Sequence, residues 1–166
     1  KSSVRFKGRS VDAPGVSLAS LSACDLVVLV SSDEVALELA PALAKKGVWV
    51  IDDSAAFRMD RKVPLVIPEV NASALRAELR LIAGPNCTMT GLAVAGALLH
   101  KKIGVKEVRV ASYQAVSGAG KTALGELFGQ YAALRATKTE ADGRAPVLGP
   151  GKSSVLPRAI AYNAIP

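Results

Sequence analysis

Aromatic residues and long apolar runs are scarce in this sequence, and each shortage excludes a class of protein. Aromatic residues make up 4% of the 166 residues, and the basic residues stand in scattered pairs without aromatic residues between them. Nucleic-acid-binding surfaces usually combine the two kinds of residue. No apolar run reaches the roughly 18 residues that a membrane-spanning helix needs. We therefore expect a protein that binds neither nucleic acid nor a membrane.

Cysteine and histidine are also rare, with two cysteines and one histidine in the chain. Cys24 and Cys87 lie far apart in different local contexts, which fits a reducing compartment better than a disulfide framework. The first residues do not form a charged stretch followed by an apolar stretch and then small residues, so we expect no secretory signal. These features predict a cytoplasmic protein, and no metal-ligand set is expected.

Apolar residues are abundant, because 50% of the sequence is hydrophobic, and the net charge is +7. The apolar content is sufficient for a folded core. The positive charge fits solvated helix and loop ends, and it is equally compatible with a protein that handles anionic small molecules.

Residues 25–53 have the pattern of a β-α-β unit with a buried parallel sheet. A β-branched run comes first, then a stretch with Val35, Leu39 and Leu43 on one helical face, then a second apolar run. Pro41 is expected to kink or shorten this helix. An extended run and a polar helix near 72–79 should follow.

The composition changes at "AGPNCTMTGL", which predicts a turn and then a helix of small residues beginning near Cys87. Further along we expect a strand at 105–110, a glycine turn at 117–120, an amphipathic helix, and a polar loop at 137–154. The predicted lobes are residues 1–84 and residues 85–166.

The glycine turn resembles a Walker A phosphate-binding loop, because Gly118 and Gly120 are followed by Lys121 and Thr122. The stricter pattern requires glycine where Ala115 stands, and a P-loop normally follows the first buried strand of its sheet. A P-loop nucleotide-binding module is therefore an alternative, but not the favoured one.

Cys87 opens a predicted helix, where the positive end of the helix dipole and unpaired N–H groups favour a thiolate. It is a candidate nucleophile, and a buried structural cysteine is the alternative. Cys24, which precedes an apolar strand, is expected to be a buried structural cysteine. His100 lies 13 residues downstream, which is roughly 20 Å along one helix. It is therefore not the partner base, and we expect it at the C-terminal end of that helix.

Three stretches together resemble aspartate-semialdehyde dehydrogenase over nearly the whole chain: "VIDDSAAFRMDRKVPLVIPEVN", "GPNCTMTGLAVAGALLHKKIGVKEVRVASYQAVSGAGK" and "LPRAIAYNAIP". The resemblance implies an α/β fold, with an incomplete Rossmann-type NADP-binding lobe (1–84) followed by part of an α+β catalytic and dimerisation lobe (85–166). It also implies NADPH-dependent reductive dephosphorylation of β-aspartyl phosphate to aspartate semialdehyde, a step toward lysine, threonine and methionine.

The resemblance assigns roles to particular residues. Cys87 would form a thioester and Gln114 would orient the substrate beside it. Asn86 would hold the acyl oxygen or the phosphate, and Arg58 would bind the phosphate, for which a guanidinium fork is suited. Ser117, Gly118 and Ser31 would contact NADP.

The resemblance implies a homodimer or homotetramer, and the pattern departs from the family at both ends. The family's glycine-rich pyrophosphate turn and its later acid/base histidine and substrate-binding arginine have no counterpart here. The sequence therefore predicts a central segment that has no dehydrogenase turnover by itself. A non-catalytic relative that serves as an assembly subunit is a further alternative.

Overall fold

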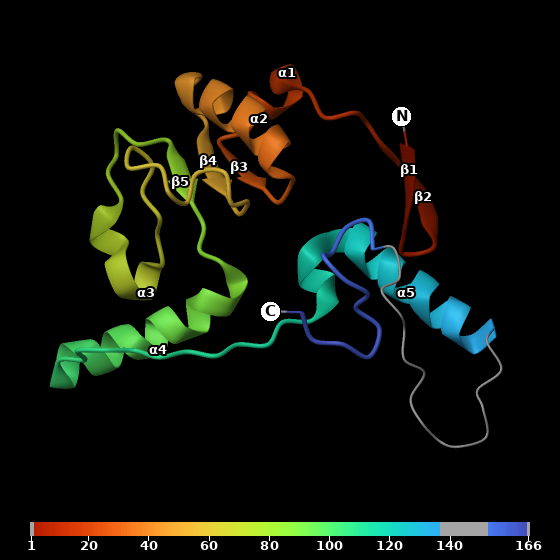
Figure 1. Ribbon diagram of the computed structural model, residues 1–166. Helices are drawn as coiled ribbons and strands as arrows, with labels where there is room; N and C mark the ends of the chain where they lie inside the picture. The colour runs from red at the N-terminus through yellow and green to blue at the C-terminus, as the bar shows by residue number, and fades with distance from the viewer. Residues whose placement is uncertain (1, 137–152, 166) are drawn as a thin grey trace. The chain divides into compact units, whose positions relative to one another are not determined.

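The computed structural model describes residues 2–136 and 153–165. The chain forms two compact units, unit 1 (1–108) and unit 2 (109–166) (Figure 1). Most of the predicted polar loop at 137–154 lies outside the described residues. The division into lobes after residue 84 stays a prediction.

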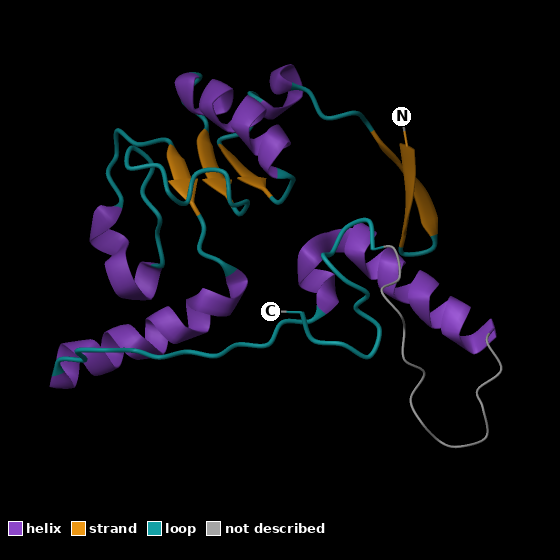
Figure 2. Ribbon diagram, in the orientation of Figure 1, coloured by secondary structure: helices purple, strands orange, loops and turns teal. Residues whose placement is uncertain are grey.

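Unit 1 contains a parallel sheet in the order β3-β4-β5, formed by β3 (Leu26–Leu29), β4 (Trp49–Asp52) and β5 (Leu81–Ala83) (Figure 2). Helix α2 (Asp33–Lys45) connects β3 to β4. Parallel strands require a crossover of this kind. The predicted β-α-β unit is thus confirmed.

The core of unit 1 lies between this sheet and α2. Leu43 of the helix and Val50 of the sheet are fully buried, and α1 (Leu18–Leu21) supplies partly buried leucines at the edge of the cluster. The core residues are Val27, Leu29, Ala36, Ala40, Leu43, Val48, Val50, Phe57 and Ala83. Alternate residues of β3 point inward, which is the period expected of a strand.

Pro41 does not shorten α2, contrary to the sequence expectation. The helix runs without interruption from Asp33 to Lys45 with Pro41 inside it. Ala40 and Leu43, on either side of the proline, are fully buried against the sheet. Their burial offsets the backbone hydrogen bond that a proline cannot donate.

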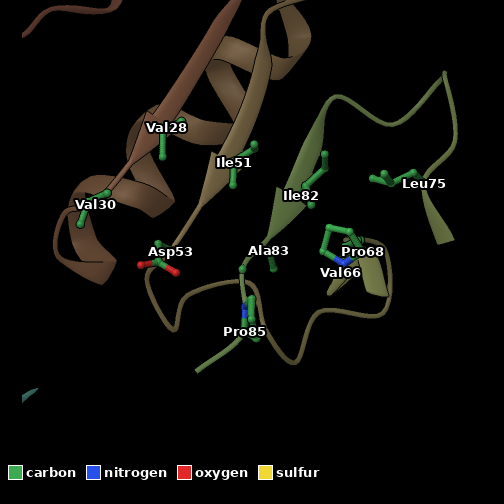
Figure 3. Close-up of a pocket in the computed structure, with 11 residues that line it drawn as sticks. Val28, Val30, Ile51, Asp53, Val66, Pro68, Leu75, Ile82, Ala83 and Pro85 are labelled. Atoms are coloured by element: carbon green, nitrogen blue, oxygen red, sulfur yellow. The ribbon is translucent and has the colours of Figure 1, made fainter. Parts of the chain in front are cut away.

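The opposite face of the sheet carries an apolar groove of about 390 Å³. Val28, Ile51 and Ile82 lie on neighbouring strands along it, with Asp53 at its end (Figure 3). Val28 is 56% exposed. Within the described residues, α2 and α1 therefore cover one face of the sheet only.

The first residues form a β-hairpin that the sequence analysis did not predict. Strands β1 (Ser2–Phe6) and β2 (Arg9–Ala13) pair antiparallel. Lys7 and Gly8, the two connecting residues, both have positive φ, at 48° and 77°. Two-residue turns with positive φ at both positions match the twist of the flanking strands.

Two predicted elements differ in the structure. The expected helix near 72–79 is replaced by the short α3 (Pro68–Asn71) and a 3-10 turn η1 (Ala72–Ala74). No strand forms at 105–110. Alternating side chains make a strand only where a neighbouring strand takes up the backbone hydrogen bonds, and no such neighbour pairs with this segment among the described residues.

Helix α4 (Cys87–Ile103) begins and ends as predicted. Asn86 caps its start, since the side chain of Asn86 accepts a hydrogen bond from the Thr88 N–H. Gly104 ends it with a left-handed backbone, the usual conformation for a C-terminal glycine. His100 lies in the last turn, where its Nδ1 is 3.1 Å from the Val105 carbonyl oxygen. The position expected for His100 is confirmed.

Unit 2 consists of a 3-10 turn η2 (Val116–Ala119), helix α5 (Gly120–Ala136) and a C-terminal segment (153–165). Two polar side chains of α5 hold the C-terminal segment. The Glu126 carboxylate accepts hydrogen bonds from the N–H groups of Ser154 and Val155. Four residues later, Gln130 Oε1 accepts from two further N–H groups, those of Ile160 and Ala161.

Candidate functional site

The carboxyl ends of the three parallel strands lie at one edge of the unit 1 sheet. Ser31 follows β3, Asp53 follows β4, and Gly84 follows β5. In open α/β sheets ligands bind beyond these strand ends, so this edge is the candidate site. Cys87 is three residues past Gly84, at the start of α4.

The loop after β4 is fixed by buried polar contacts. Asp52 is fully buried, and its carboxylate accepts hydrogen bonds from the Ser54 N–H at 3.2 Å and the Ser54 hydroxyl at 2.7 Å. The Ala55 N–H donates to the carboxylate of Asp33 in the first turn of α2. The chain therefore leaves β4 in a defined direction, toward Arg58.

Arg58 connects this loop to the turn that precedes Cys87. Its Nε donates to the Gly84 carbonyl at 3.0 Å, and its Nη2 donates to the Asp53 carbonyl at 2.8 Å and the Pro85 carbonyl at 3.4 Å. Charged donors make stronger hydrogen bonds than neutral ones. Arg58 thus joins the end of β4 to the turn after β5, while its Nη1 takes no part in these contacts.

Gly84 lets the turn after β5 pack closely against the end of β4. Its N–H donates to the Asp52 carbonyl at 2.7 Å, and a Cβ at this position would lie 2.9 Å from Asp53 Oδ1 and 3.3 Å from the Asp52 carbonyl oxygen. A Cβ would therefore force the Asp53 side chain to move and the backbone to shift by a few tenths of an ångström. The turn before Cys87 accordingly favours glycine at position 84.

Cys87 is the first residue of α4, and its side chain is exposed. Asn86 Oδ1 accepts from both the N–H of Thr88, at 3.0 Å, and the Thr88 hydroxyl, at 2.6 Å. The predicted placement of Cys87 at a helix start is therefore confirmed. Cys24 is exposed too, although it was expected to be a buried structural cysteine, so that expectation is wrong.

Ser31 lies beyond β3 at an exposed position, where its hydroxyl donates weakly to the Ser32 carbonyl at 3.4 Å. The two residues after Ser32, Asp33 and Glu34, place carboxylates in the first turn of α2. A hydrogen bond from the Ser32 side chain lowers the pKa of Glu34. Because two carboxylates repel an anion, they make this helix start unfavourable for a phosphate.

Gln114, Ser117 and Gly118 lie together in unit 2. The Gly118 N–H donates to the Ala115 carbonyl at 2.9 Å, which turns the chain so that the Gln114 side chain lies against the Cα of Gly118. Ser117 is exposed in the same turn. The expected approach of Gln114 to Cys87 joins residues of different units and stays a prediction.

Two family models match the chain. Residues 5–78 match the NAD binding domain of semialdehyde dehydrogenase, and residues 96–166 match the dimerisation domain of semialdehyde dehydrogenase. The chain belongs to the semialdehyde dehydrogenase family. Its fold is accordingly α/β, a Rossmann-like NAD-binding part followed by a dimerisation part, as predicted from the sequence.

Relatives within the semialdehyde dehydrogenase family carry more specific names. The chain is 38% identical over 163 residues to aspartate-semialdehyde dehydrogenase of Bacillus subtilis, covering 98% of the chain and 46% of that protein. It is 37% identical over 164 residues to the Aquifex aeolicus enzyme of the same name, covering 97% of the chain and 45% of the relative. The chain thus spans about half the length of these relatives.

A solved structure gives the same result. The crystal structure of aspartate semialdehyde dehydrogenase II from Vibrio cholerae, complexed with ASA, superposes with a TM-score of 0.78 and 33% sequence identity. The match covers 98% of the chain and 46% of that protein. The predicted resemblance to aspartate-semialdehyde dehydrogenases is confirmed.

The Walker-like turn of this semialdehyde dehydrogenase relative does not have the surroundings of a P-loop. Residues 111–115, before the turn, form no strand, whereas a P-loop follows one. Lys121 and Thr122 lie within the first turn of α5. The missing strand argues against the alternative nucleotide-binding module, whereas a lysine and a threonine at the start of a helix also occur in P-loops.

Sequence reasoning missed one residue that shapes the site and two that hold the C-terminal segment of unit 2. Gly84 was not singled out, although a glycine directly after a buried strand often marks close backbone approach. Glu126 and Gln130 were also missed; their signal is a polar pair four residues apart on a mainly apolar helix. Among the described residues, no helix is long and apolar enough to cross a membrane.

Proposed function

We propose that this chain supplies the nucleophile and part of the cofactor site of an aspartate-semialdehyde dehydrogenase. The reaction is the NADPH-dependent reductive dephosphorylation of β-aspartyl phosphate to aspartate semialdehyde and phosphate. The observation that carries the proposal is an exposed cysteine at the first position of α4, in a chain that matches both semialdehyde dehydrogenase models. The names of the relatives favour the aspartate enzyme.

The proposed chemistry starts with the Cys87 thiolate. Its sulfur attacks the acyl carbon of β-aspartyl phosphate and forms an S–C bond. The C–O bond to the phosphate breaks, and inorganic phosphate leaves with the electron pair, which gives a thioester on Cys87. Supplying a hydride to this thioester is the chemistry that NADPH would contribute. The backbone N–H groups at the start of α4 are suited to hold the developing oxyanion.

Arg58 and Asn86 are proposed to hold the anionic part of the substrate. The Arg58 guanidinium already has its orientation, because Nε and Nη2 donate to main-chain carbonyls. The donors of Nη1 are then available to a phosphate oxygen without the loss of entropy that an unrestrained arginine would suffer. Asn86, next to Cys87 in sequence, is proposed to bind the acyl oxygen or the phosphate.

The remaining predicted residues have supporting roles. Gln114 is proposed to orient the thioester, Ser117 and Gly118 to contact NADP at its nicotinamide end, and Ser31 to contact the dinucleotide. The two acidic residues after Ser32 disfavour a phosphate at that position. The match to a dimerisation domain supports a homodimer or homotetramer. A cytoplasmic location stays a prediction.

Acylation of Cys87 tests this proposal directly. The chain is incubated with β-aspartyl phosphate, or with acetyl phosphate as a simpler acyl phosphate, and its peptides are examined by mass spectrometry. We expect acyl transfer to the peptide that contains Cys87 and release of an equal amount of phosphate.

Two variants control this experiment. Cys87→Ser should abolish acylation, while Cys24→Ser should leave it unchanged, because Cys24 is an exposed thiol that is not at the start of a long helix. Equal acylation of both cysteines would show ordinary thiol chemistry and would contradict the assigned nucleophile. Binding of ATP with magnesium that is lost in Lys121→Ala would favour the nucleotide-binding alternative instead.

A further inference from the structure

The two glycines of the turn between Gln114 and α5 are required for different reasons. Gly120 has a φ of 89° with nothing near the position of a Cβ, so its requirement is conformational. At Gly118 a Cβ would lie 2.7 Å from Cδ and 3.0 Å from Cγ of Gln114, and closer still to Nε2. Its φ is not in the left-handed range, so glycine is needed at position 118 because a side chain there would have no room.

The Gln114 carboxamide occupies that space. The hydrogen bond between the Gly118 N–H and the Ala115 carbonyl folds the turn, which brings the side chain of residue 114 over the Cα of residue 118. An ordinary carbon contact is about 3.5–4.0 Å, so a methyl group on residue 118 would displace the carboxamide carbon by about 1 Å and the carboxamide nitrogen by more. Because Gln114 is exposed and has three rotatable bonds, it can move away without unfolding the turn.

We propose that Gly118 is a positioning residue for Gln114. It leaves open the space in which the carboxamide lies, and so it fixes where that carboxamide is presented. This inference rests on the proposed function, in which Gln114 orients the thioester on Cys87. It differs from the cofactor contact proposed for Gly118, because the affected group is another side chain of the same turn.

A spectroscopic experiment tests the contact without any assay of activity. The chain contains two glutamines, Gln114 and Gln130, so labelling glutamine side-chain nitrogen with ¹⁵N gives two NH₂ groups in an NMR spectrum, assigned with Gln114→Ala. In Gly118→Ala the Gln114 signals should shift and the Gln130 signals should stay in place. Gln130 is held by its own contacts to Ile160 and Ala161.

Gly125→Ala is the matched control. Gly125 lies in α5, and a Cβ there would meet nothing within 4 Å, so the Gln114 signals should not change. Unshifted Gln114 signals in Gly118→Ala would overturn the inference. If Gly118→Ala fails to fold, the Gln114→Ala/Gly118→Ala double variant should fold again, since it lacks the clashing carboxamide; a double variant that also fails to fold would contradict the proposal.

A double-mutant cycle tests the consequence for chemistry. A displacement of about 1 Å at a positioned group can cost roughly 100-fold in rate, so Gly118→Ala should slow acylation of Cys87 by up to that factor. In the Gln114→Ala background the same change should have almost no effect. Equal losses in both backgrounds would overturn the assigned role. A parent chain that is not acylated at all would contradict the proposed function, whereas the NMR result would still decide the contact.

Discussion

Units 1 and 2 hold their segments in place by different kinds of contact. In unit 1 the fully buried large side chains are Leu43, Val50 and Asp52, two of them apolar residues packed between a helix and a parallel sheet. In unit 2 two polar side chains of α5, Glu126 and Gln130, accept hydrogen bonds from main-chain N–H groups of the C-terminal segment, beside an edge-to-face ring contact between Tyr131 and Tyr162.

The difference has a physical consequence. Apolar burial stabilises in proportion to the area removed from water and depends little on pH, whereas a carboxylate accepts N–H groups more strongly while it is charged. Unit 1 should therefore respond to changes in side-chain volume and unit 2 to changes in charge. The two units can be followed by separate fluorescent residues. The only tryptophan, Trp49, lies in β4 of unit 1, and the three tyrosines, Tyr113, Tyr131 and Tyr162, lie in unit 2.

The largest expected effect comes from Leu43→Ala in the core of unit 1. Leu43 is fully buried, so its truncation leaves a cavity and should lower the free energy of unfolding by about 2–5 kcal/mol. Denaturant unfolding followed by Trp49 fluorescence measures this. Leu37→Ala on the same helix, at a side chain that is 55% exposed, should change stability far less; equal losses would mean that unit 1 does not depend on this core.

Gly84→Ala should be the next most damaging change. The added Cβ would lie 3.3 Å from the Asp52 carbonyl oxygen, a backbone atom that cannot rotate away, and overpacking of this kind costs about 1–3 kcal/mol. Gly96→Ala is the matched control, because that helical position has nothing within 4 Å of a Cβ and alanine favours a helix. A neutral Gly84→Ala variant would show that the turn before Cys87 is loosely packed.

Arg58→Lys tests the connection between β4 and the turn before Cys87. A lysine cannot donate to three carbonyls in the fork geometry of arginine, so we expect a loss of about 1–2 kcal/mol. We also expect Cys87 to react about 2–5-fold more slowly with iodoacetamide, the factor that corresponds to the contribution of a helix terminus.

Cys24 serves as the internal reference for that rate, and Arg61→Lys, an exposed change three residues along the same loop, is the control variant. Iodoacetamide is neutral and carries no phosphate, so its rate does not depend on phosphate binding by Arg58. An unchanged ratio of the two cysteine rates would restrict Arg58 to its proposed role in substrate binding.

The smallest expected effect is a pH dependence confined to unit 2. The hydrogen bond from the Ser153 hydroxyl, with smaller contributions from the N–H groups of Val155 and Ser154, lowers the pKa of Glu126 below its usual 4.5. A lowered pKa in the folded state means that this stabilisation is present at neutral pH. It is lost as the pH falls below the usual value and through the lowered one.

Amide hydrogen exchange at Ser154 and Val155 measures that change. Both amides should be protected at pH 7 and lose protection in acid, and Glu126→Gln should remove most of the difference between the two conditions. Glu38→Gln, an exposed change in α2 of unit 1, should leave it intact. Acid-resistant protection at residues 154 and 155 would show that the segment is held by other contacts.

Local sequence patterns correctly predicted those elements that depend only on residues close together in the sequence. The β-α-β unit follows from apolar periodicity, and the start of α4 follows from the turn before Cys87. The strand expected at 105–110 failed because pairing depends on a neighbour, which periodicity does not specify. The hairpin was missed because its turn uses a lysine with positive φ, at Lys7, a conformation that lysine seldom adopts.

The candidate site was predictable in its residues but not in its contacts. Cys87 and Asn86 could be placed at a helix start because both depend on adjacent sequence. The donation of Arg58 to the carbonyls of Gly84 and Pro85 joins residues 26 and 27 positions apart, which only the parallel pairing of β4 and β5 brings together. The contact between Gln114 and Gly118 depends on the fold of a turn that resembled a phosphate loop in the sequence.

The cap at the start of α4 also determines which ligands the site can discriminate. Asn86 Oδ1 is already shared by the N–H and the hydroxyl of Thr88, so this oxygen has little capacity left for a ligand. What the amide can still offer is its NH₂ group, a pure donor. The contact with a ligand that we propose for Asn86 beside Cys87 would therefore favour ligands that present lone pairs and give no partner to those that present only protons.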